Sequence, residues 1–483
     1  MTIGEKGFKL ATPIKFGTDG WRGVIADDFT FDNVRVCAQS VADYLNGAGL
    51  APRGLIVGYD TRFASEDFAA AAAEVAAANG ISVHLCQEAT PTPLISYAIL
   101  VKQAGGAIVI TASHNPASWN GFKYKLESAR SASPEVIAEL ERHISRIQAS
   151  GMVKQMPLDQ ALKEGIVTRF DPSLPYVHHI GELVDLERLR QSGLKVMVDS
   201  MYGAGMGYFH SILSGGATEV TEIHGERNPL FPGLQPEPIA SNLIELSARV
   251  KGDGASVGLA TDGDADRIGI IDELGEFLTP LQVFALLALY LLEVCDQRGA
   301  IIKTITSTSM LYRLGELYGV PVHETPVGFK YVAPKMLAEG ALIGGEESGG
   351  FAFRSHMPER DGILSGLLFL DLMVREQKSP SQLVDYLFSK VGPHYYERID
   401  VEFPAGEREA ITNRLSMSKP SHIENTTVTE LDTSDGFRFL LADRTWLLIR
   451  FSGTEPILRI YAESDSRARV KRLLAAGRRM AGV

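Results

Sequence analysis

Three polar loops in this chain each follow a short apolar run and carry side chains that can do chemistry. The first, residues 111–116 (TASHNP), presents the hydroxyl of Ser113 where Pro116 blocks simple helix continuation. Ser113 is therefore a candidate nucleophile. We expect the adjacent His114 to be poorly placed as the base of a catalytic triad, which disfavours acyl transfer. The alternative is a strand-ending turn whose Ser and Asn side chains bond the backbone.

The second loop, residues 261–267 (TDGDADR), carries Asp262, Asp264 and Asp266 between two apolar runs. Three like charges this close need a compensating cation, and carboxylate oxygens suit Mg²⁺ or Mn²⁺, with water or a phosphoryl oxygen as further ligands. An EF-hand is excluded because Arg267 stands where that loop needs glycine and because strands are expected on both sides. A solvated acidic turn is the alternative.

The third loop, residues 344–350 (GGEESGG), has glycines that let the backbone approach a ligand. Its side chains Glu346, Glu347 and Ser348 suit sugar hydroxyls. Paired carboxylates also serve glycoside hydrolysis, but adjacent residues in an extended loop point apart, which argues against that chemistry.

A fourth group of polar residues surrounds a predicted turn near the end of the sequence. Ser452, Gly453 and Thr454 offer hydroxyl and backbone donors for a phosphate, and Arg450 and Arg459 flank them. An ordinary hairpin with surface arginines is the alternative.

The elements that must position these loops alternate between β-rich apolar runs and Ala- and Leu-rich segments of helical length. This pattern is typical of βαβ units, so the predicted fold class is α/β. A Gly-rich turn at 200–207 lacks the full dinucleotide spacing, and we expect a tight strand-to-helix turn there rather than a nucleotide site. The predicted strands are 54–58, 81–85, 107–111, 194–199, 255–260, 268–271, 300–304, 341–345, 445–451 and 457–463, and the predicted helices include 67–79 and 281–294.

Ligands of open α/β sheets bind outside the carboxyl ends of the strands, so we expect the three loops to face one cleft. Breaks between domains are predicted at 171–175 and 272–280, and the polar stretch 376–380 is expected to precede a last helix before the third break. From about Pro393 the pattern changes to strands with a closing helix, which predicts a smaller α+β domain.

Length and composition exclude several classes of protein. At roughly 150 residues per domain, 483 residues predict about three domains. With 47 Lys and Arg against 59 Asp and Glu, the net charge of −12 disfavours nucleic acid and anionic membranes as partners. Three dispersed cysteines, no apolar signal core at the start and no apolar run of membrane-spanning length predict a cytoplasmic protein.

Taken together and in order, these motifs resemble those of the α-D-phosphohexomutase superfamily, the phosphoglucomutases and phosphomannomutases, over essentially the whole chain. Residues 16–23 (FGTDGWRG) and 120–123 (NGFK) resemble two further family segments. The resemblance implies a heart-shaped arrangement of three related α/β domains and a C-terminal α+β phosphate-binding domain. The implied domains are 1–170 with the phosphoserine loop, 171–275 with the metal loop, 276–390 with the sugar loop and 391–483 with the phosphate loop.

The resemblance also implies a mechanism. Ser113 would carry a phosphoryl group that passes to a sugar monophosphate and returns through a glucose 1,6-bisphosphate intermediate, which also acts as activator. Mg²⁺ would be held by the three aspartates together with Ser113. Arg22 and Lys123 would lie beside the phosphoserine, and His114 or Lys123 would transfer protons. The implied substrate ligands are Arg267, Lys330, Glu346, Ser348, Arg450, Ser452, Gly453, Thr454 and Arg459.

One departure from the family pattern bears on specificity. Many phosphomannomutase-type and glucosamine-type members have His after the Ser-Gly of the sugar loop, where this chain has Gly350. Glu347 in place of Gln also argues against the glucosamine branch, so the expected substrates are glucose 1-phosphate and glucose 6-phosphate. The alternatives are another phosphohexose, a glucose 1,6-bisphosphate synthase and a non-catalytic sugar-phosphate sensor. A phosphosugar is the only partner indicated, and the sequence leaves the oligomeric state open.

Overall fold

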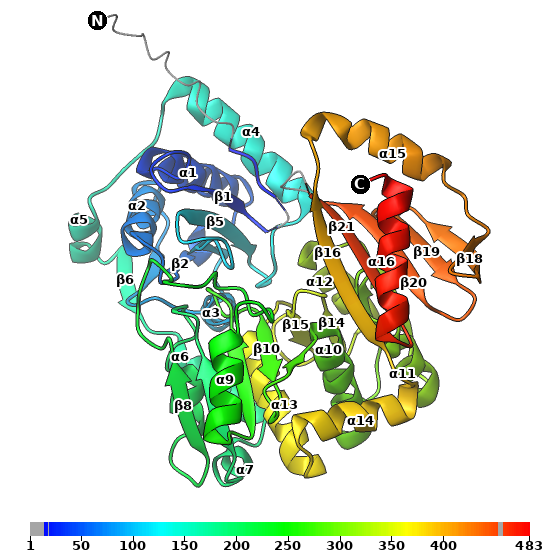
Figure 1. Ribbon diagram of the computed structural model, residues 1–483. Coiled ribbons are helices and arrows are strands. Elements are labelled where there is room, and N and C mark those ends of the chain that lie inside the picture. Colours follow the sequence, from blue (N-terminus) through cyan, green and yellow to red (C-terminus); the bar gives the residue numbers. More distant parts are fainter. Residues whose placement is uncertain (1–13, 18, 453–456) are drawn as a thin grey trace, which may run out of the picture. The chain divides into compact units, whose positions relative to one another are not determined.

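The computed structural model describes residues 14–17, 19–452 and 457–483. The chain forms two compact units, which we describe separately. The first consists of the residues up to Ser173 together with Asn228–Gln235, and the second of Leu174–Arg227 and Pro236–Val483. Figure 1 labels the helices and strands of both units. Among the described residues, no helix is long and apolar enough to cross a membrane.

The first unit is built on a six-stranded sheet whose central strands are parallel and buried. The strand β2, with the sequence LIVGY, is buried at every position, as expected for a parallel strand covered on both faces. In order across the sheet, the strands are β1 (Trp21–Val24), β5 (Trp119–Leu126), β4 (Gly106–Ile110), β2 (Leu55–Tyr59), β3 (Val83–Cys86) and β6 (Val167–Phe170). The helices are α1 (Phe31–Gly47), α2 (Ser65–Ala78), α3 (Thr92–Lys102), α4 (Pro134–Ser150) and α5 (Leu158–Lys163).

The second unit begins with a five-stranded sheet in the order β11 (Phe277–Leu278), β10 (Ile268–Ile271), β9 (Val257–Thr261), β7 (Lys195–Asp199) and β8 (Glu219–Ile223). Its helices are α6 (Ser173–Leu183), α7 (Leu186–Arg190), α8 (Tyr208–Leu213) and α9 (Ile244–Asp253). A four-stranded sheet follows, in the order β13 (Val322–Thr325), β12 (Ile301–Thr304), β14 (Ile343–Gly345) and β15 (Phe351–Phe353). Its helices are α10 (Pro280–Leu289), α11 (Met310–Tyr318), α12 (Phe329–Glu339), α13 (Gly362–Glu376) and α14 (Pro380–Val391).

These three sheets share one strand order. Each contains the series β5-β4-β2-β3, β10-β9-β7-β8 or β15-β14-β12-β13, in which the first strand is antiparallel and the other three are parallel. The three polar loops lie at the same point of this order, because each joins the third parallel strand to the antiparallel strand. Equivalent backbone positions therefore present the serine, the aspartates and the glutamates.

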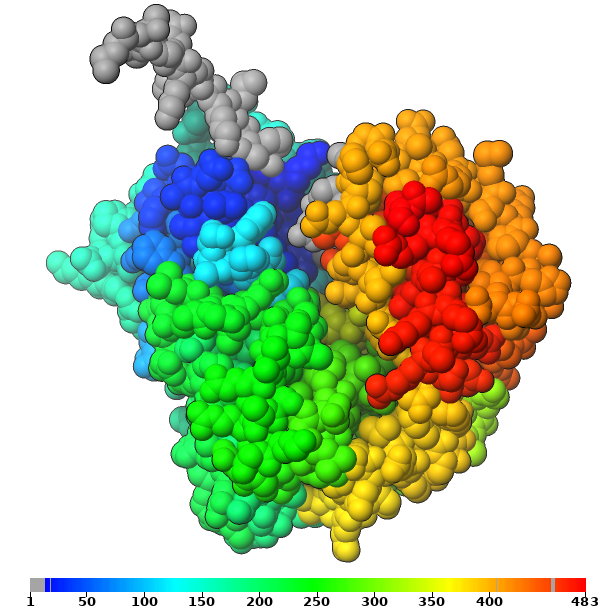
Figure 2. Space-filling model, viewed as in Figure 1, coloured from blue at the N-terminus to red at the C-terminus, as the bar shows by residue number. Residues whose placement is uncertain are grey.

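The C-terminal part of the second unit is an antiparallel sheet covered by a helix. Its strands, in order, are β16 (Tyr395–Glu402), β21 (Ile457–Ser464), β20 (Trp446–Phe451), β19 (Phe437–Leu441), β18 (Thr426–Asp432) and β17 (His422–Ile423). The helices are α15 (Arg408–Met417) and α16 (Arg467–Ala481). Figure 1 shows α16 lying across β16, β20 and β21, and in Figure 2 its outer face lies on the surface. The predicted α+β class of this part is confirmed.

The segments 171–175 and 272–280, where breaks between domains are predicted, contain regular structure. The helix α6 begins inside the first segment, where the carboxylate of Asp171 accepts a hydrogen bond from the backbone N–H of Ser173 at 2.8 Å. The second segment contains β11, which pairs with β10. In both places polar residues organise a turn at the start of a regular element. The predicted helix 281–294 ends in a π-helical turn, Tyr290–Val294.

Candidate active site

Each of the three loops contains one residue with a left-handed backbone. The φ angles are 53° for Ser113, 58° for Ala265 and 88° for Gly349. A left-handed residue reverses the chain sharply, which lets a short loop connect two adjacent strands. At Gly349 the conformation also requires space, because a Cβ would lie 2.8 Å from the carbonyl oxygen of Ile268.

Ser113 is 1% exposed and sits in a tight turn in which the backbone N–H of Asn115 donates to the carbonyl oxygen of Ala112. The Nδ1 atom of His114 lies 3.3 Å from Oγ of Ser113. The imidazole of His114 therefore reaches this hydroxyl, although we expected the adjacent residue to be poorly placed for a triad-type hydrogen bond. The turn brings the two neighbouring side chains together, whereas in an extended strand they would point to opposite faces.

Two of the predicted basic residues lie on the neighbouring strands β1 and β5 of the same sheet. Arg22 on β1 donates a hydrogen bond from Nη1 to the side-chain oxygen of Asn115 in the serine loop. Lys123 on β5 is 1% exposed, and its Nζ lies 2.8 Å from Oδ2 of Asp19. The carboxylate of Asp19 also lies 3.4 Å from the buried Lys125. The sheet thus connects Arg22 directly to the loop and pairs Lys123 with an acid that the sequence did not single out.

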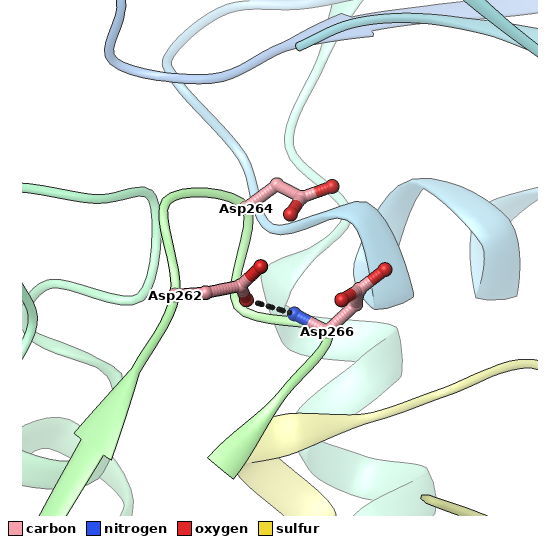
Figure 3. A group of neighbouring side chains, drawn as sticks. All are labelled: Asp262, Asp264 and Asp266. Atoms are coloured by element: carbon pink, nitrogen blue, oxygen red, sulfur yellow. Dashed lines mark hydrogen bonds between the residues drawn. The ribbon is translucent and has the colours of Figure 1, made fainter. Parts of the chain in front are cut away.

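The carboxylates of Asp262, Asp264 and Asp266 converge (Figure 3). All three residues are fully buried, and one ligand oxygen from each lies within 4.8 Å of the others. The backbone N–H groups of Asp266 and Arg267 donate to Oδ1 of Asp262 at 3.0 and 3.1 Å, which orients the first carboxylate. A convergent set of three buried carboxylates fits a hard divalent cation such as Mg²⁺.

The Gly-rich turn after β7 supports this loop from behind. A Cβ at Gly203 would lie 2.9 Å from the carbonyl oxygens of Asp262 and Gly263, and the N–H of Ala204 donates to that of Gly263 at 2.9 Å. The helix α8 follows at once. The predicted tight strand-to-helix turn is confirmed, and its glycines allow the two backbones to touch.

Arg267 is buried among acids. Its Nη1 lies 3.3 Å from Glu237, and its Nε lies 3.9 and 3.8 Å from the carboxylates of Asp262 and Asp266. Burial alone would lower the pKa of Arg267, but Asp262 and Glu237 outweigh it and raise the pKa. The guanidinium therefore stays charged and offsets part of the negative charge of the aspartate loop.

In the third loop, the two glutamates contact different partners, as predicted. Glu346 is buried, and its Oε1 accepts a hydrogen bond from the N–H of Gly328 at 3.1 Å. Burial raises the pKa of Glu346 despite the nearby arginines. Glu347 instead accepts from the hydroxyl of Tyr396 at 2.7 Å and from Arg398 at 3.3 Å, both on β16. Glu347 thus ties the loop to the C-terminal sheet.

Arg360 is a residue that the sequence reasoning missed. Its Nη2 lies 2.7 Å from Oδ2 of Asp266 and its Nη1 3.2 Å from Oε2 of Glu346. One buried guanidinium thereby joins the aspartate loop to the glutamate loop. A sequence signal did exist, since Glu359-Arg360-Asp361 is a run of three charges between β15 and the apolar helix α13.

The predicted phosphate-binding residues lie on the hairpin of β20 and β21. Arg450 and Arg459 are directly opposite each other in the strand register. Nε of Arg450 donates to Oδ1 of Asp435 at 2.9 Å, and Arg459 lies 3.6 Å from Asp400. Ser452 is buried, and its N–H donates to the carbonyl oxygen of Ile457. Gly453 and Thr454 lie outside the described residues, as does Thr18 of the amino-terminal motif.

The remaining candidates lie on α12 and in the glutamate loop of the same unit. Lys330 is the second residue of α12, and its Nζ lies 5.3 Å from the ring centre of Tyr331. Ser348 is half-buried in the glutamate loop. The loop before α12 contacts the C-terminal domain, because the N–H of Val327 donates to Oδ2 of Asp435 at 2.9 Å. Asp435 therefore contacts both this loop and Arg450.

Comparison with protein families matches the four domain models of one family along the chain. These are phosphoglucomutase/phosphomannomutase α/β/α domain I at residues 13–150, domain II at 174–275, domain III at 279–391 and the C-terminal domain at 406–479. The chain belongs to the phosphoglucomutase/phosphomannomutase family. It is an enzyme of the isomerase class that interconverts sugar phosphates, with three related α/β domains and a C-terminal α+β domain. The boundaries given by the sequence, 1–170, 171–275, 276–390 and 391–483, stay a prediction.

Individual relatives match over nearly their whole length. A phosphoglucomutase of Komagataeibacter xylinus is 31% identical over 93% of this chain and 87% of its own. A phosphoglucomutase/phosphomannomutase of Thermococcus kodakarensis is also 31% identical, over 96% of this chain and 97% of its own. A Thermus thermophilus structure described as a candidate phosphomannomutase is 34% identical, with a TM-score of 0.85, over 98% of this chain and 100% of its own. Other relatives are named phosphoglucosamine/phosphogalactosamine mutase and phosphoglucosamine mutase.

Proposed function

We propose that this enzyme interconverts glucose 1-phosphate and glucose 6-phosphate by carrying a phosphoryl group on Ser113. The observation that supports the proposal most is the common position of the three loops, each between the third parallel strand and the antiparallel strand of its sheet. One loop offers a hydroxyl beside an imidazole, the second three convergent carboxylates and the third a buried glutamate. These are the groups that a phosphoryl carrier, a cation site and a sugar site require.

In the proposed reaction, phosphoserine 113 transfers its phosphoryl group to a hydroxyl of the sugar monophosphate. The bond between phosphorus and Oγ breaks, a bond to the sugar oxygen forms, and the proton of the sugar hydroxyl ends on Oγ. Glucose 1,6-bisphosphate results, and its other phosphate returns to Ser113 by the reverse step. His114, with Nδ1 3.3 Å from Oγ, and Lys123 are the candidates that move the proton. Arg22 and Lys123 hold the transferring oxygens.

We assign Mg²⁺ to Asp262, Asp264 and Asp266, with an oxygen on Ser113 as a further ligand. When bound, the cation stabilises the negative charge of the phosphoryl group during transfer. The chain's own arginines prepare the site, because Arg267 and Arg360 offset part of the charge of the three carboxylates. Partial neutralisation lets three carboxylates stay close together in a buried loop.

Glu346 and Ser348 are the proposed ligands of the sugar hydroxyls. The hydrogen bond from Gly328 and the contact with Arg360 support a carboxyl group of Glu346 held in one orientation. The phosphate that is not transferred is proposed to bind Arg450, Arg459 and Ser452, with Gly453 and Thr454. Two further residues, Lys330 and Arg267, are proposed to contact the substrate. Charge-assisted hydrogen bonds from arginine suit a phosphate dianion.

Glucose is favoured over other sugars by the GEES sequence of the loop and by the phosphoglucomutase among the relatives. Glucosamine 1-phosphate is a second candidate, because one relative is named phosphoglucosamine mutase and another phosphoglucosamine/phosphogalactosamine mutase. The presence of Glu347 no longer discriminates between glucose and glucosamine as substrates, since its carboxylate contacts Tyr396 and Arg398. Its identity reflects the contact with β16 as much as any contact with a sugar.

The test is a comparison of kcat/KM for the 1-phosphates of glucose, mannose, glucosamine and a pentose, with the purified enzyme primed by glucose 1,6-bisphosphate. We expect the highest value for glucose 1-phosphate. A higher kcat/KM for glucosamine 1-phosphate would show that glucosamine, and not glucose, is the preferred sugar, and would leave the proposed mechanism unchanged. No turnover of any of them, with Ser113 found unphosphorylated by mass spectrometry, would overturn the proposal.

A bisphosphate synthase would use the same residues but release its intermediate. Fructose 1,6-bisphosphate supplied as phosphoryl donor together with glucose 1-phosphate separates the two reactions. We expect catalytic turnover to glucose 6-phosphate with no build-up of glucose 1,6-bisphosphate. Accumulation of glucose 1,6-bisphosphate in proportion to the donor consumed would assign the synthase reaction instead.

A further inference from the structure

A buried ion pair holds the main chain of the serine loop, and the mechanism above does not use it. Asp60 and Arg62 directly follow β2 and are 1% and 0% exposed. Nε of Arg62 lies 3.2 Å from Oδ2 of Asp60. Each charge offsets the other, so the pair is tolerated in the interior only as a unit.

Asp60 reaches the loop through the hydroxyl of Thr111. Oγ1 of Thr111 donates to Oδ2 of Asp60 at 2.6 Å and accepts a hydrogen bond from the backbone N–H of Ser113 at 2.8 Å. The other carboxylate oxygen of Asp60 accepts from Ser65 and from the N–H of Arg62, each at 3.0 Å. The acid is thereby fixed, and it fixes the amide on the N-terminal side of Ser113.

Arg62 holds the other side of Ser113. Its Nη2 donates to the carbonyl oxygens of Ser113 and Asn115, both at 2.6 Å. Its Nη1 donates to those of Pro116 at 2.8 Å and Trp119 at 3.0 Å. A single guanidinium therefore binds four carbonyl groups of the loop, which its fork of donors allows and an ammonium group cannot reproduce.

A distant segment of the chain completes this arrangement. Phe231 is 2% exposed, and its ring centre lies 5.1 Å from the guanidinium carbon of Arg62. Nε2 of Gln235 donates to the carbonyl oxygen of His114 at 2.9 Å. Both residues belong to the segment 228–235, which is part of the first compact unit. Each carbonyl oxygen from Ser113 to Pro116 thus accepts a hydrogen bond.

We propose that Asp60, Arg62 and Thr111 are positioning residues for the phosphoryl carrier, an inference that rests on the proposed role of Ser113. Ser113 has a left-handed backbone, a conformation that is uncommon for a residue other than glycine and that costs free energy to hold. The network binds the N–H and the C=O of that residue and leaves Oγ beside His114. The network thereby fixes the position of Oγ of Ser113, and its proposed role does not include binding the sugar.

A positioning role makes a specific kinetic prediction. Displacing the reacting oxygen slows both phosphoryl transfers, while the phosphosugar keeps its own binding groups. Loss of the network should therefore lower kcat and the rate at which glucose 1,6-bisphosphate phosphorylates Ser113, and leave KM nearly unchanged. A role in stability alone would lower the melting temperature and leave kcat per folded molecule as it is.

The sharpest test is Thr111→Val, which keeps the size of the side chain and removes the hydroxyl between Asp60 and Ser113. We expect kcat to fall by roughly 10- to 100-fold, with KM within about twofold, and Thr111→Ser to restore most of it. The matched control is Thr218→Val. Thr218 is also buried and donates to the carbonyl oxygen of Leu189, but it lies in the other unit. This variant should lose stability and keep kcat.

Arg62→Lys and Arg62→Met test the guanidinium itself, with Ser113 phosphorylation followed by mass spectrometry of the whole protein. We expect Arg62→Lys to be slowed and Arg62→Met to be slowed further. If Arg62→Met fails to fold, the kinetics of Thr111→Val alone test the positioning role. Wild-type rates of phosphorylation and turnover in Thr111→Val would overturn the positioning role. A wild-type enzyme that never carries phosphate on Ser113 would instead overturn the proposed function.

Discussion

The side chain of Arg360 passes so close to Gly350 that a Cβ at position 350 would lie 2.3 Å from Cδ of Arg360. Beyond that point the guanidinium reaches Asp266 and Glu346. Because glycine alone lacks a Cβ, the residue at position 350 decides whether Arg360 can join the aspartate loop to the glutamate loop. Gly350 in this chain therefore goes together with the buried Arg360.

Gly350→Ala is expected to displace Arg360 and lower the free energy of unfolding by about 1–3 kcal/mol, the range for overpacking a filled site. In an Arg360→Ala background the added methyl group finds room, so the same substitution should cost much less. Urea unfolding of the four proteins measures the coupling. Equal costs in both backgrounds would show that the two side chains do not compete for space.

Ser113→Ala is expected to abolish turnover and to change the free energy of unfolding by less than about 1.5 kcal/mol, because one hydroxyl contact is lost. The matched control is Ser96→Ala, since the hydroxyl of Ser96 on α3 is buried and makes no hydrogen bond to any described residue. Coupled assays and urea unfolding compare the two. Residual turnover near the wild-type rate in Ser113→Ala would exclude this serine as carrier.

Asp264→Asn should weaken Mg²⁺ binding and activity together, because one of three converging anions becomes neutral. With a chelator present, relief of like-charge repulsion should leave the melting temperature unchanged or raise it. A thermal-shift titration with MgCl₂ measures both effects, with the exposed Asp253→Asn as control. A wild-type Mg²⁺ response in Asp264→Asn would remove the cation from this loop.

Glu324 provides a test of acid stability. Burial alone would raise its pKa, but Lys303, 2.7 Å away, and Arg438 outweigh burial and lower the pKa to about 2. Because this pKa lies below the ordinary value of 4.5, the stabilisation is complete above about pH 4.5 and is lost as the pH falls toward 2. Glu324→Gln should therefore cost on the order of 3 kcal/mol at pH 7 and little at pH 2.

The control for this prediction is Glu316→Gln. Glu316 also pairs with an arginine of the C-terminal domain, Arg444, at 2.9 Å, but both side chains are about half exposed. Solvent screens such a pair, so the cost should stay below about 1 kcal/mol at any pH. Unfolding followed from pH 7 to pH 2 compares the two variants. A cost for Glu324→Gln that grows toward acid pH would contradict the lowered pKa.

The sequence was most informative where the residues of a functional group lie close together in the chain. Asp262, Asp264 and Asp266 fall within five positions, between strands predicted at 255–260 and 268–271 and observed as Val257–Thr261 and Ile268–Ile271. Local patterns determine such elements, because strand alternation and turn chemistry act over a few residues. The fold class and the identity of the loops followed from these patterns.

Contacts between distant residues could not be predicted in this way. Arg62 holds a loop some 50 positions later, and Glu347 meets Tyr396 and Arg398 from another domain. No periodicity in the sequence encodes which buried charge faces which partner. The contact between His114 and Ser113 was missed for a different reason, since it depends on the left-handed turn at Ser113.

Arg450 and Arg459 face each other across the hairpin of β20 and β21, and like charges in that register repel. Asp435 and Asp400 each offset one of them. On the proposed role of this hairpin, a phosphate dianion converts the repulsion into two attractions. The ligand then acts as a counter-ion that completes the fold, so occupancy and folding of the C-terminal domain become one linked equilibrium, with a melting temperature that follows the phosphosugar concentration.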